Sequence, residues 1–184
     1  MTSTSAQTKH PQPPVMLDGF EVLDDCHRET VLRLGELAEL VAGLDSDTPS
    51  AAARQTAATI VAFFSTTARQ HHEDEEKHVF PALLAAGNDE VVRAVQRLRQ
   101  DHGWLEADWN EIEPQLDALA SGQAWVDLDV LREGAEIFVA LSRDHVALEE
   151  AFIYPQARAA MRDPERRAMG REMAARRRAR RGKS

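Results

Sequence analysis

One motif occurs twice in this chain, and it constrains the fold more than any other feature. Residues 71–81 and 145–155 both read His-x-x-x-Glu-Glu-x-x-x-aromatic-Pro, and the two copies begin 74 residues apart. A single histidine precedes each copy, His27 by 44 residues and His102 by 43 residues. Self-similarity at a long period indicates that one structural unit is used twice. The chain is therefore expected to consist of two similar halves.

The spacing within the motif predicts a helix that presents two metal-binding side chains on one face. Residues four apart on an α-helix are separated by about 40° around the axis and about 6 Å along it. His71 and Glu75 therefore share a face, and so do His145 and Glu149. Imidazoles and carboxylates on the inner faces of packed helices are ligands for metal ions. Two copies of the motif indicate two metal ions.

Length and composition predict an all-α protein with a single folded domain. The chain has 184 residues, of which 43% are hydrophobic and 29% charged, which is typical of soluble globular proteins. Alternating runs of β-branched residues are scarce, which favours helices over strands. The hydrophobic spacing predicts helices over about 17–44, 50–86, 89–120 and 127–161. Short connections between long helices favour an up-down-up-down antiparallel four-helix bundle.

Proline, glycine and asparagine mark the expected boundaries of these helices. Pro81 is expected to kink or end the regular part of its helix, and Asn88 to cap the next one. Asp163 and Pro164 resemble a cap and a first helical residue, so a short basic helix or arm should follow. We therefore divide the chain into a flexible lead at 1–15, a bundle at 16–162 and a basic tail at 163–184.

The charge is unevenly distributed between the bundle and the tail. The whole chain carries −9, but residues 171–184 contain seven basic residues and one acidic residue, which leaves −15 for residues 1–170. An acidic body repels phosphate groups, so it is not expected to bind nucleic acid. The basic tail has three possible states: a solvated arm, a segment folded onto the acidic body, or a site for an external anionic partner.

Nothing in the sequence indicates secretion or insertion into a membrane. No apolar run approaches the ~18–20 residues that would span a bilayer, and the first fifteen residues lack the apolar core of a signal peptide. The single cysteine, Cys26, has no partner for an internal disulfide. We expect a cytoplasmic location. Cys26 is either a buried apolar residue or a functional thiol beside His27.

Six residues are expected to converge inside the bundle as metal ligands: His27, His71, Glu75, His102, His145 and Glu149. This mixed set of nitrogen and oxygen donors suits iron, manganese or zinc and does not suit calcium or copper(I). If both carboxylates bridge, the set fills about eight of the roughly twelve positions around two octahedral ions. The remaining positions would be open to solvent or to an exogenous ligand, as in reactive sites.

These motifs resemble those of the hemerythrin-like HHE cation-binding domains. The resemblance covers roughly residues 17–160, and it includes the Glu-Glu-x-x-x-Phe-Pro ending at Glu75–Pro81. It implies a non-haem di-iron centre in which Glu75 and Glu149 bridge and the four histidines are terminal ligands, with iron preferred to manganese or zinc. Members of the family bind or sense dioxygen or nitric oxide, handle peroxide, or help to maintain iron.

The resemblance therefore implies a protein that binds, senses or reduces a small oxidant, namely dioxygen, nitric oxide or peroxide. The alternative is a non-catalytic iron buffer or an iron-responsive interaction module. One position departs from the oxygen carriers of the family, which have a second histidine four residues after the histidine of the third helix. This chain has Glu106 there. A carboxylate is still able to act as an extra ligand, but a site with fewer histidines and more carboxylates argues against reversible oxygen carriage.

Several neighbours of the six predicted ligands have two interpretations. Glu76 and Glu150 either accept hydrogen bonds that orient the histidines or are solvated acids, and the same choice applies to three aspartates near ligand histidines, Asp25, Asp101 and Asp144. His72 has Val146 as its counterpart in the second copy, so we expect it outside the ligand set. Tyr154, the counterpart of Phe80, is expected to pack in the core.

Overall fold

The computed structural model describes residues 18–44, 49–86, 88–123 and 125–181. The regular structure in these ranges is helical throughout and includes no strand, which confirms the all-α prediction. The N-terminal lead at 1–15 lies outside the described residues. Four long rods form the body. The first rod is α1 (Gly19–Gly43), and the third is α5 (Asp89–Ala120). The second rod consists of α2 (Ala51–Ala62), η1 (Phe63–Ala68), α3 (Arg69–Asp74), η2 (Glu75–Val79) and α4 (Phe80–Ala86), and the fourth consists of α6 (Leu128–Leu148), η3 (Glu149–Ile153) and α7 (Tyr154–Ala160).

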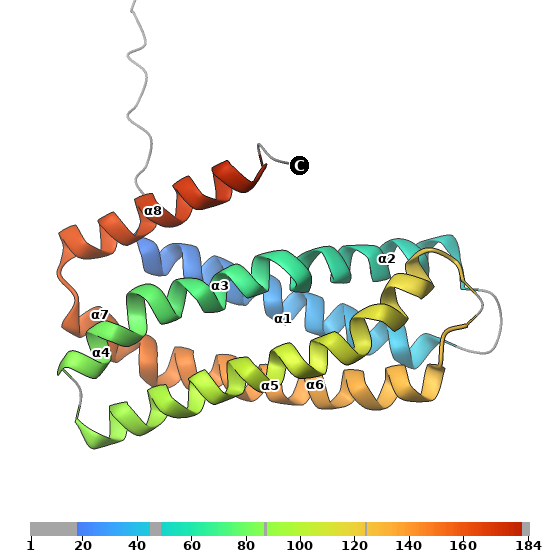
Figure 1. Ribbon diagram of the computed structural model, residues 1–184, viewed down its shortest axis with the longest axis horizontal. Helices are drawn as coiled ribbons and strands as arrows, with labels where there is room; N and C mark the ends of the chain where they lie inside the picture. Colours follow the sequence, from blue (N-terminus) through green and yellow to red (C-terminus); the bar gives the residue numbers. More distant parts are fainter. Residues whose placement is uncertain (1–17, 45–48, 87, 124, 182–184) are drawn as a thin grey trace, which may run out of the picture.

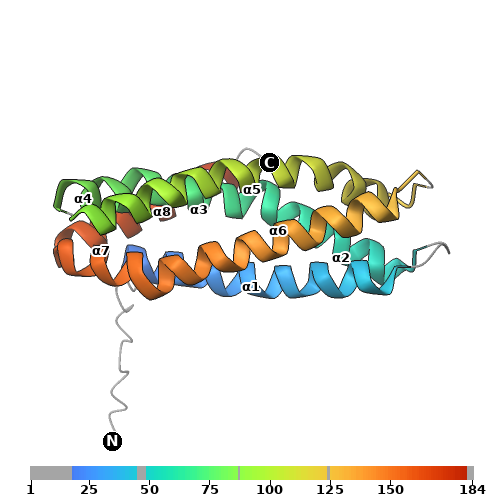
Figure 2. The ribbon, with the colours of Figure 1, turned by 90° about the horizontal axis from the view of Figure 1, so that it is seen from below.

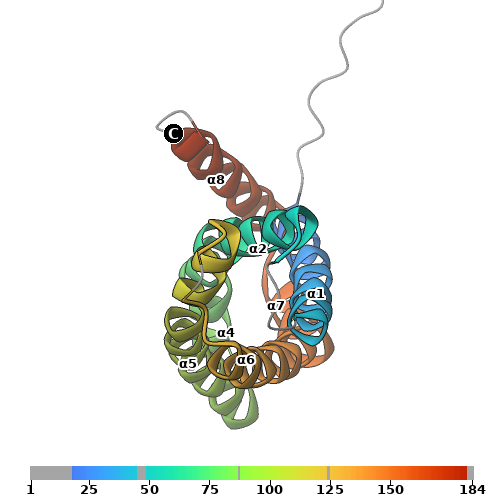
Figure 3. The ribbon, with the colours of Figure 1, turned by 90° about the vertical axis from the view of Figure 1, so that its right-hand side faces the viewer.

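The four rods lie side by side along the longest axis of the molecule (Figure 1). α1 runs the length of the molecule from left to right in this view, and the rod from α2 to α4 returns beneath the C-terminal helix. The view turned by 90° shows α1 and α6 adjacent along their length (Figure 2). Seen end-on, the rods surround a common centre (Figure 3). Side chains on the inner face of every rod can therefore meet.

Short polar side chains define where the rods begin. Each of these side chains accepts hydrogen bonds from backbone N–H groups of the first helical turn, which would otherwise lack partners. The capping residues are Asp18 for α1, Ser50 for α2, Asn88 for α5 and Asp127 for α6. The prediction that Asn88 caps the third long helix is confirmed, and α5 then continues through Pro114 to Ala120.

Pro81 was expected to kink or end the regular part of its helix, and the rod continues past it to Ala86. The helix instead widens into the π-helical turn η2 directly before it, where the N–H of Phe80 donates to the carbonyl of Glu75 five residues back. The second copy of the motif does the same in η3, where the N–H of Tyr154 donates to the carbonyl of Glu149 before Pro155. A proline lacks an N–H, so it disrupts the regular α-helical ladder, and a π turn changes the register beside it. The repeated sequence thus produces a repeated irregularity.

The hydrophobic core is divided into two clusters by the six predicted ligand residues. Among the members of the cluster near the α1–α2 connection are Leu34, Leu37, Ile60, Leu116, Leu119 and Leu131. The cluster near the α4–α5 connection includes Phe20, Leu23, Phe80, Val95, Leu98 and Ile153. On every rod the predicted ligands lie in sequence between residues of these two clusters. The middle of the molecule is therefore a buried polar layer.

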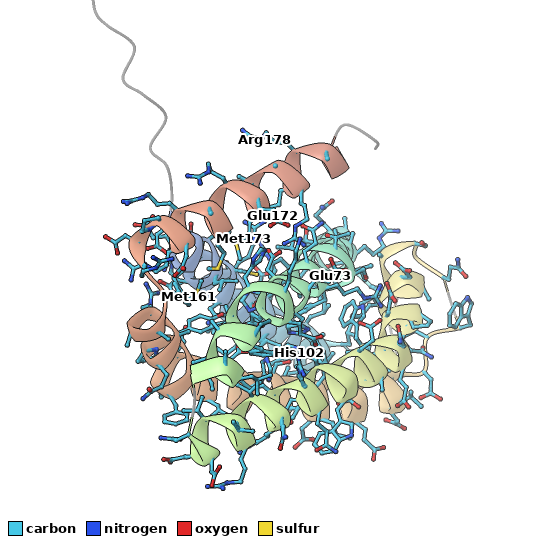
Figure 4. All side chains as sticks on the ribbon, turned by 60° about the vertical axis from the view of Figure 1, so that its left-hand side comes forward. Glu73, His102, Met161, Glu172, Met173 and Arg178 are labelled. Carbon is cyan, nitrogen blue, oxygen red and sulfur yellow. The ribbon has the colours of Figure 1, made fainter. Side chains whose placement is uncertain are left out.

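The basic tail forms a helix, α8 (Asp163–Arg181), that packs against the bundle. Met169 and Met173 are buried in the core cluster near α4, and Figure 4 shows Met173 on the side of α8 that faces the bundle and Arg178 on the outer side. Arg166 forms an ion pair with Asp18 at 2.9 Å. Of the three states considered for the tail, its described part takes the folded one.

Two further contacts join α8 to the second rod. Arg176 pairs with the buried Asp74, and Lys77 pairs with Glu172.

The first residue of α8 differs from the prediction by one position. α8 begins at Asp163, so Asp163 is not its cap as predicted. The backbone N–H of Arg162 instead donates to the Glu165 carboxylate at 2.8 Å, because a glutamate three residues into a helix can reach back to this group.

Candidate metal centre

The structure brings together all six predicted ligand residues from the four rods. Their side chains are buried, with relative exposures of 1% for His27, 3% for His71, 0% for Glu75, 6% for His102, 2% for His145 and 0% for Glu149. They form two groups in which the candidate ligand atoms lie within 4.8 Å of one another. One group comprises His27, His71, Glu75 and Glu149, and the other comprises Glu75, His102, His145 and Glu149.

The two glutamates belong to both groups, and each histidine belongs to one. Each carboxylate directs one oxygen toward a histidine of each group. The distances to the Nε2 atoms are 3.4 Å from Glu75 Oε1 to His71, 3.5 Å from Glu75 Oε2 to His102, 3.1 Å from Glu149 Oε2 to His27 and 3.1 Å from Glu149 Oε1 to His145. This arrangement would allow each carboxylate to bridge two metal ions.

Two of the histidines are oriented by the second glutamate of the opposite motif. Nδ1 of His102 donates to Glu76 at 2.8 Å, and Nδ1 of His27 donates to Glu150 at 3.2 Å. A carboxylate accepts, so Nδ1 carries the proton and Nε2 keeps its lone pair for a metal. Both Nε2 atoms face the shared glutamates. The interpretation of Glu76 and Glu150 as orienting acceptors is thereby confirmed.

The three nearby aspartates have different environments. Asp101 is 1% exposed, and its Oδ2 lies 3.7 Å from Nδ1 of His145. Asp25 pairs on the surface with Arg28, and Asp144 is exposed. Asp101 is therefore the one of the three that is placed to orient a histidine of the cluster.

The chemistry of the buried donors fits a metal cation. Several nitrogen and oxygen atoms have no hydrogen-bond partner among the described residues, and they include Glu75 Oε2, both oxygens of Glu149, His102 Nε2 and His145 Nε2. Leaving buried polar atoms unpaired is costly in free energy. A cation bound by these atoms would satisfy them together. The six residues could therefore hold a metal.

Burial and mutual interaction shift the pKa values within the cluster. Burial, followed by the charge of Glu149, raises the pKa of Glu75 to about 7. Burial lowers the pKa of His145, but the carboxylates of Glu149, Asp101 and Glu75 together outweigh it and raise that pKa to about 10. Burial, followed by the neighbouring His27, lowers the pKa of His71 well below its usual range. The cluster thus holds protons that a metal ion would displace on binding.

Tyr154 was expected to pack in the core, and this prediction is incomplete because its hydroxyl reaches the cluster. The hydroxyl donates to Glu75 Oε1 at 2.6 Å and lies 3.1 Å from Nε2 of His27. Its ring stacks on His27, with centroids 5.0 Å apart, as the ring of Phe80 stacks on His102 at 5.6 Å. The two halves therefore match in ring packing and differ by one hydroxyl. That difference between the two motif copies was the sequence signal for a role of Tyr154.

Replacing Tyr154 by phenylalanine is expected to weaken metal binding by roughly 10–100-fold while leaving the stoichiometry unchanged. The ring would still stack on His27, but Glu75 would lose the donor that orients its Oε1. Metal competition titrations would measure the affinity. Phe20→Leu is the control, because Phe20 packs edge-on against the same ring and has no polar side-chain atom to orient a ligand. Equal affinities of Tyr154→Phe and wild type would contradict the orienting role.

A small cavity of about 40 Å³ adjoins the cluster on the side of His71 and His145. Much of its lining is apolar and comes from Phe64, Leu105, Trp109, Phe138 and Val146. About 10–15 Å³ measured in this way accommodates one water molecule. The cavity therefore has room for a molecule of a few atoms next to the candidate ligands.

Glu106 lines this cavity but is not part of the cluster. Nε of Arg69 donates to Glu106 Oε2 at 2.9 Å, and Nη2 of Arg69 lies 2.8 Å from Oε1. The side chain of Glu106 is 48% exposed. Both oxygens are thus engaged by a guanidinium near the surface, a geometry that matches a carboxylate well. Glu106 does not belong to the groups of candidate ligand atoms that the structure brings together.

Cys26 is not a reactive thiol in this structure. Its side chain is 4% exposed, and burial raises its pKa to about 12. Reactive cysteines have lowered pKa values and partial exposure. Of the two interpretations of Cys26, the structure therefore supports the buried apolar residue.

Comparisons with known proteins agree with this geometry. A family model described as the hemerythrin HHE cation binding domain matches residues 18–157. No curated protein is detectably similar to the chain. Among the residues that the structure describes, no helix is both long and apolar enough to cross a membrane.

Proposed function

This chain belongs to the hemerythrin HHE cation-binding domain family, and from that premise we propose that it holds two iron ions and uses them to bind, sense or reduce a small oxidant. The observation that carries the proposal is the position of the two glutamates. Glu75 and Glu149 each direct one oxygen toward either histidine pair, as bridging carboxylates would. His27 and His71 would hold one ion, and His102 and His145 the other.

Iron is the metal that the family resemblance implies, in preference to manganese or zinc. The donor set of imidazoles and carboxylates is compatible with all three metals. Iron, when bound, would supply the redox chemistry with dioxygen, nitric oxide or peroxide. The protein would contribute the orientation of the ligands, the exclusion of bulk water and the hydroxyl group of Tyr154, whose oxygen lies 2.6 Å from Glu75 Oε1.

The cavity beside the cluster supports a small ligand. Its volume of about 40 Å³ suits a molecule of two or three atoms, and its apolar lining suits an uncharged one. Arg69 and Glu106 lie at its polar part, where their ion pair is partly exposed. We infer that dioxygen, nitric oxide or peroxide would reach the ions through this cavity.

The remaining predictions about organisation and location are part of the same proposal. We propose residues 16–162 as the metal-binding unit, an up-down-up-down antiparallel four-helix bundle, and residues 163–184 as a basic appendage. A cytoplasmic location is consistent with a chain whose single cysteine is a buried thiol. The outer side of α8, which carries Arg178, is where an anionic partner would bind if the appendage has one.

One observation favours the alternative function, an iron-responsive interaction module. Asp74 immediately precedes Glu75, is 2% exposed, and is paired with Arg176 of α8. A change in the position of Glu75 on metal binding would therefore shift Asp74 and alter its ion pair with Arg176, which holds α8 against the bundle. Metal-dependent binding of a partner, without any change on exposure to an oxidant, would favour this alternative.

Metal analysis and an optical spectrum of anaerobically purified protein would test the proposal. We expect about two irons per chain and a near-ultraviolet band that grows on exposure to air, because an open di-iron centre reacts with oxidants. His71→Ala should lose this band. If the protein instead contains two zinc or manganese ions and its spectrum does not respond to air, the two-metal site stands and the proposed reaction with an oxidant is overturned. The absence of stoichiometric metal would overturn the whole proposal.

A further inference from the structure

His72 lies beside the candidate metal centre, although the corresponding residue in the second motif copy is Val146. Its ring stacks on His102 with centroids 4.1 Å apart and an angle of 16° between planes, and it lies 5.4 Å from the ring of His145. One ring nitrogen from each of these three histidines falls within 4.8 Å of the others. Two ligands on one ion are at most about 4.2 Å apart when each bond is about 2.1 Å. Small rotations would therefore bring all three onto one ion.

His72 also has no other polar role among the described residues. It takes part in no hydrogen bond or ion pair with them, although it is partly buried. Its neighbours on the helix differ, since His71 faces Glu75 and Glu73 is exposed. Its ring contacts are with three other imidazoles, those of His71, His102 and His145. Coordination of a shared cation would account for the arrangement.

The position of Glu106 leaves room for such a ligand. The oxygen carriers of the family have a histidine at that position, one helical turn after the histidine of the third helix. Here Glu106 is directed outward and held by Arg69, at 2.9 Å and 2.8 Å. His72 and Glu106 both line the cavity beside His145. His72 therefore reaches this cavity from α3, on the side where Glu106 of α5 is held by Arg69.

We propose that His72 is a fifth histidine ligand, and that it binds the metal ion held by His102 and His145. The inference rests on the proposed two-metal site and adds to it. The ion near His102 and His145 would then have three histidine ligands, whereas the ion near His27 and His71 would have two. The two ions are therefore inequivalent, and the first has fewer positions open to solvent or to an exogenous ligand.

Anaerobic titration of metal-free protein with ferrous iron, followed by Mössbauer spectroscopy, tests this inference. We expect His72→Phe and His72→Ala to weaken the affinity of one of the two sites for iron by at least about tenfold. Loss of a residue that merely orients a ligand already costs roughly 10–100-fold in metal affinity. One iron signal should change and the other should stay. His72→Phe keeps a ring that can stack on His102 and removes the nitrogen, so it separates coordination from packing.

His78→Ala is the matched control, because His78 lies six residues further along the same rod and pairs with Glu172 away from the cluster. It should bind both ions as the wild type does. Wild-type affinity and unchanged spectra in His72→Phe would overturn the inference and leave the two-iron proposal intact. Failure of the wild type to bind iron would overturn both. If the wild type takes manganese or zinc instead, the same titration with that metal decides the role of His72.

Discussion

Glu149→Ala is expected to remove both metal ions from the protein, whereas His102→Ala is expected to weaken mainly one. Glu149 belongs to both of the groups that contain the two glutamates, and His102 belongs to only one of these two groups. The two oxygens of Glu149 lie 3.1 Å from a histidine of either group. Losing it would deprive each ion of a carboxylate and leave Glu75 as the one carboxylate that the two ions share. Metal analysis after gel filtration would measure the number of ions retained.

Glu150→Ala is the matched control for this result. Glu150 is the next residue, is partly exposed, and contacts the cluster only by accepting a hydrogen bond from His27. Its loss should weaken binding by roughly 10–100-fold at one site and preserve both ions at saturating metal. Retention of one ion at wild-type affinity in Glu149→Ala would show that this carboxylate does not bridge.

Removal of the metal is expected to destabilise the folded protein by about 5 kcal/mol. An ion present at 100 times its dissociation constant stabilises the native state by about 2.7 kcal/mol, and two ions act together. For a chain of this size, each kcal/mol corresponds to about 2–4 °C in melting temperature. Thermal unfolding with and without a chelator should therefore differ by roughly 10–20 °C. In the metal-free protein, buried metal-ligand atoms such as the two oxygens of Glu149 are left without hydrogen-bond partners.

Glu149→Ala provides the internal control for this second prediction as well. Since it should bind neither ion, its melting temperature should not respond to chelator or to added metal. Equal melting temperatures of wild-type protein with and without metal would mean that the cluster is stable as an all-protein arrangement. That result would contradict a role for metal in the fold.

The repeat made the fold class and the convergence of six residues predictable. Helical spacing places His71 and Glu75 on one face, and the same spacing applies to His145 and Glu149. The structure brings these residues together with His27 and His102, and their role as ligands stays a prediction. Hydrophobic periodicity and capping residues such as Asn88 placed the rods to within a few residues.

The π turns help to explain how the hydroxyl of Tyr154 reaches the cluster, which the sequence did not predict. Residues five apart in a regular α-helix point about 140° away from each other, so regular spacing does not place Tyr154 on the same face as Glu149. The hydrogen bond from Tyr154 to Glu149 five residues back closes a wider turn, which returns the tyrosine to the inner side. The position of His72 was missed because the two motif copies were compared residue by residue, and its counterpart in the second copy is Val146. Packing of α8 depends on Met169 and Met173, whose partners lie far away in sequence.

The polar layer between the two hydrophobic clusters has a consequence for how the molecule opens. Each cluster draws residues from all four rods, so each can act as a separate cooperative unit of local unfolding. The cluster near α4 also includes Met169 and Met173, which ties the C-terminal helix to that half. Ligands that lie between the halves on every rod would join them when they share ions. Amide hydrogen exchange should then show two protection levels in the metal-free protein that merge into one when metal is bound.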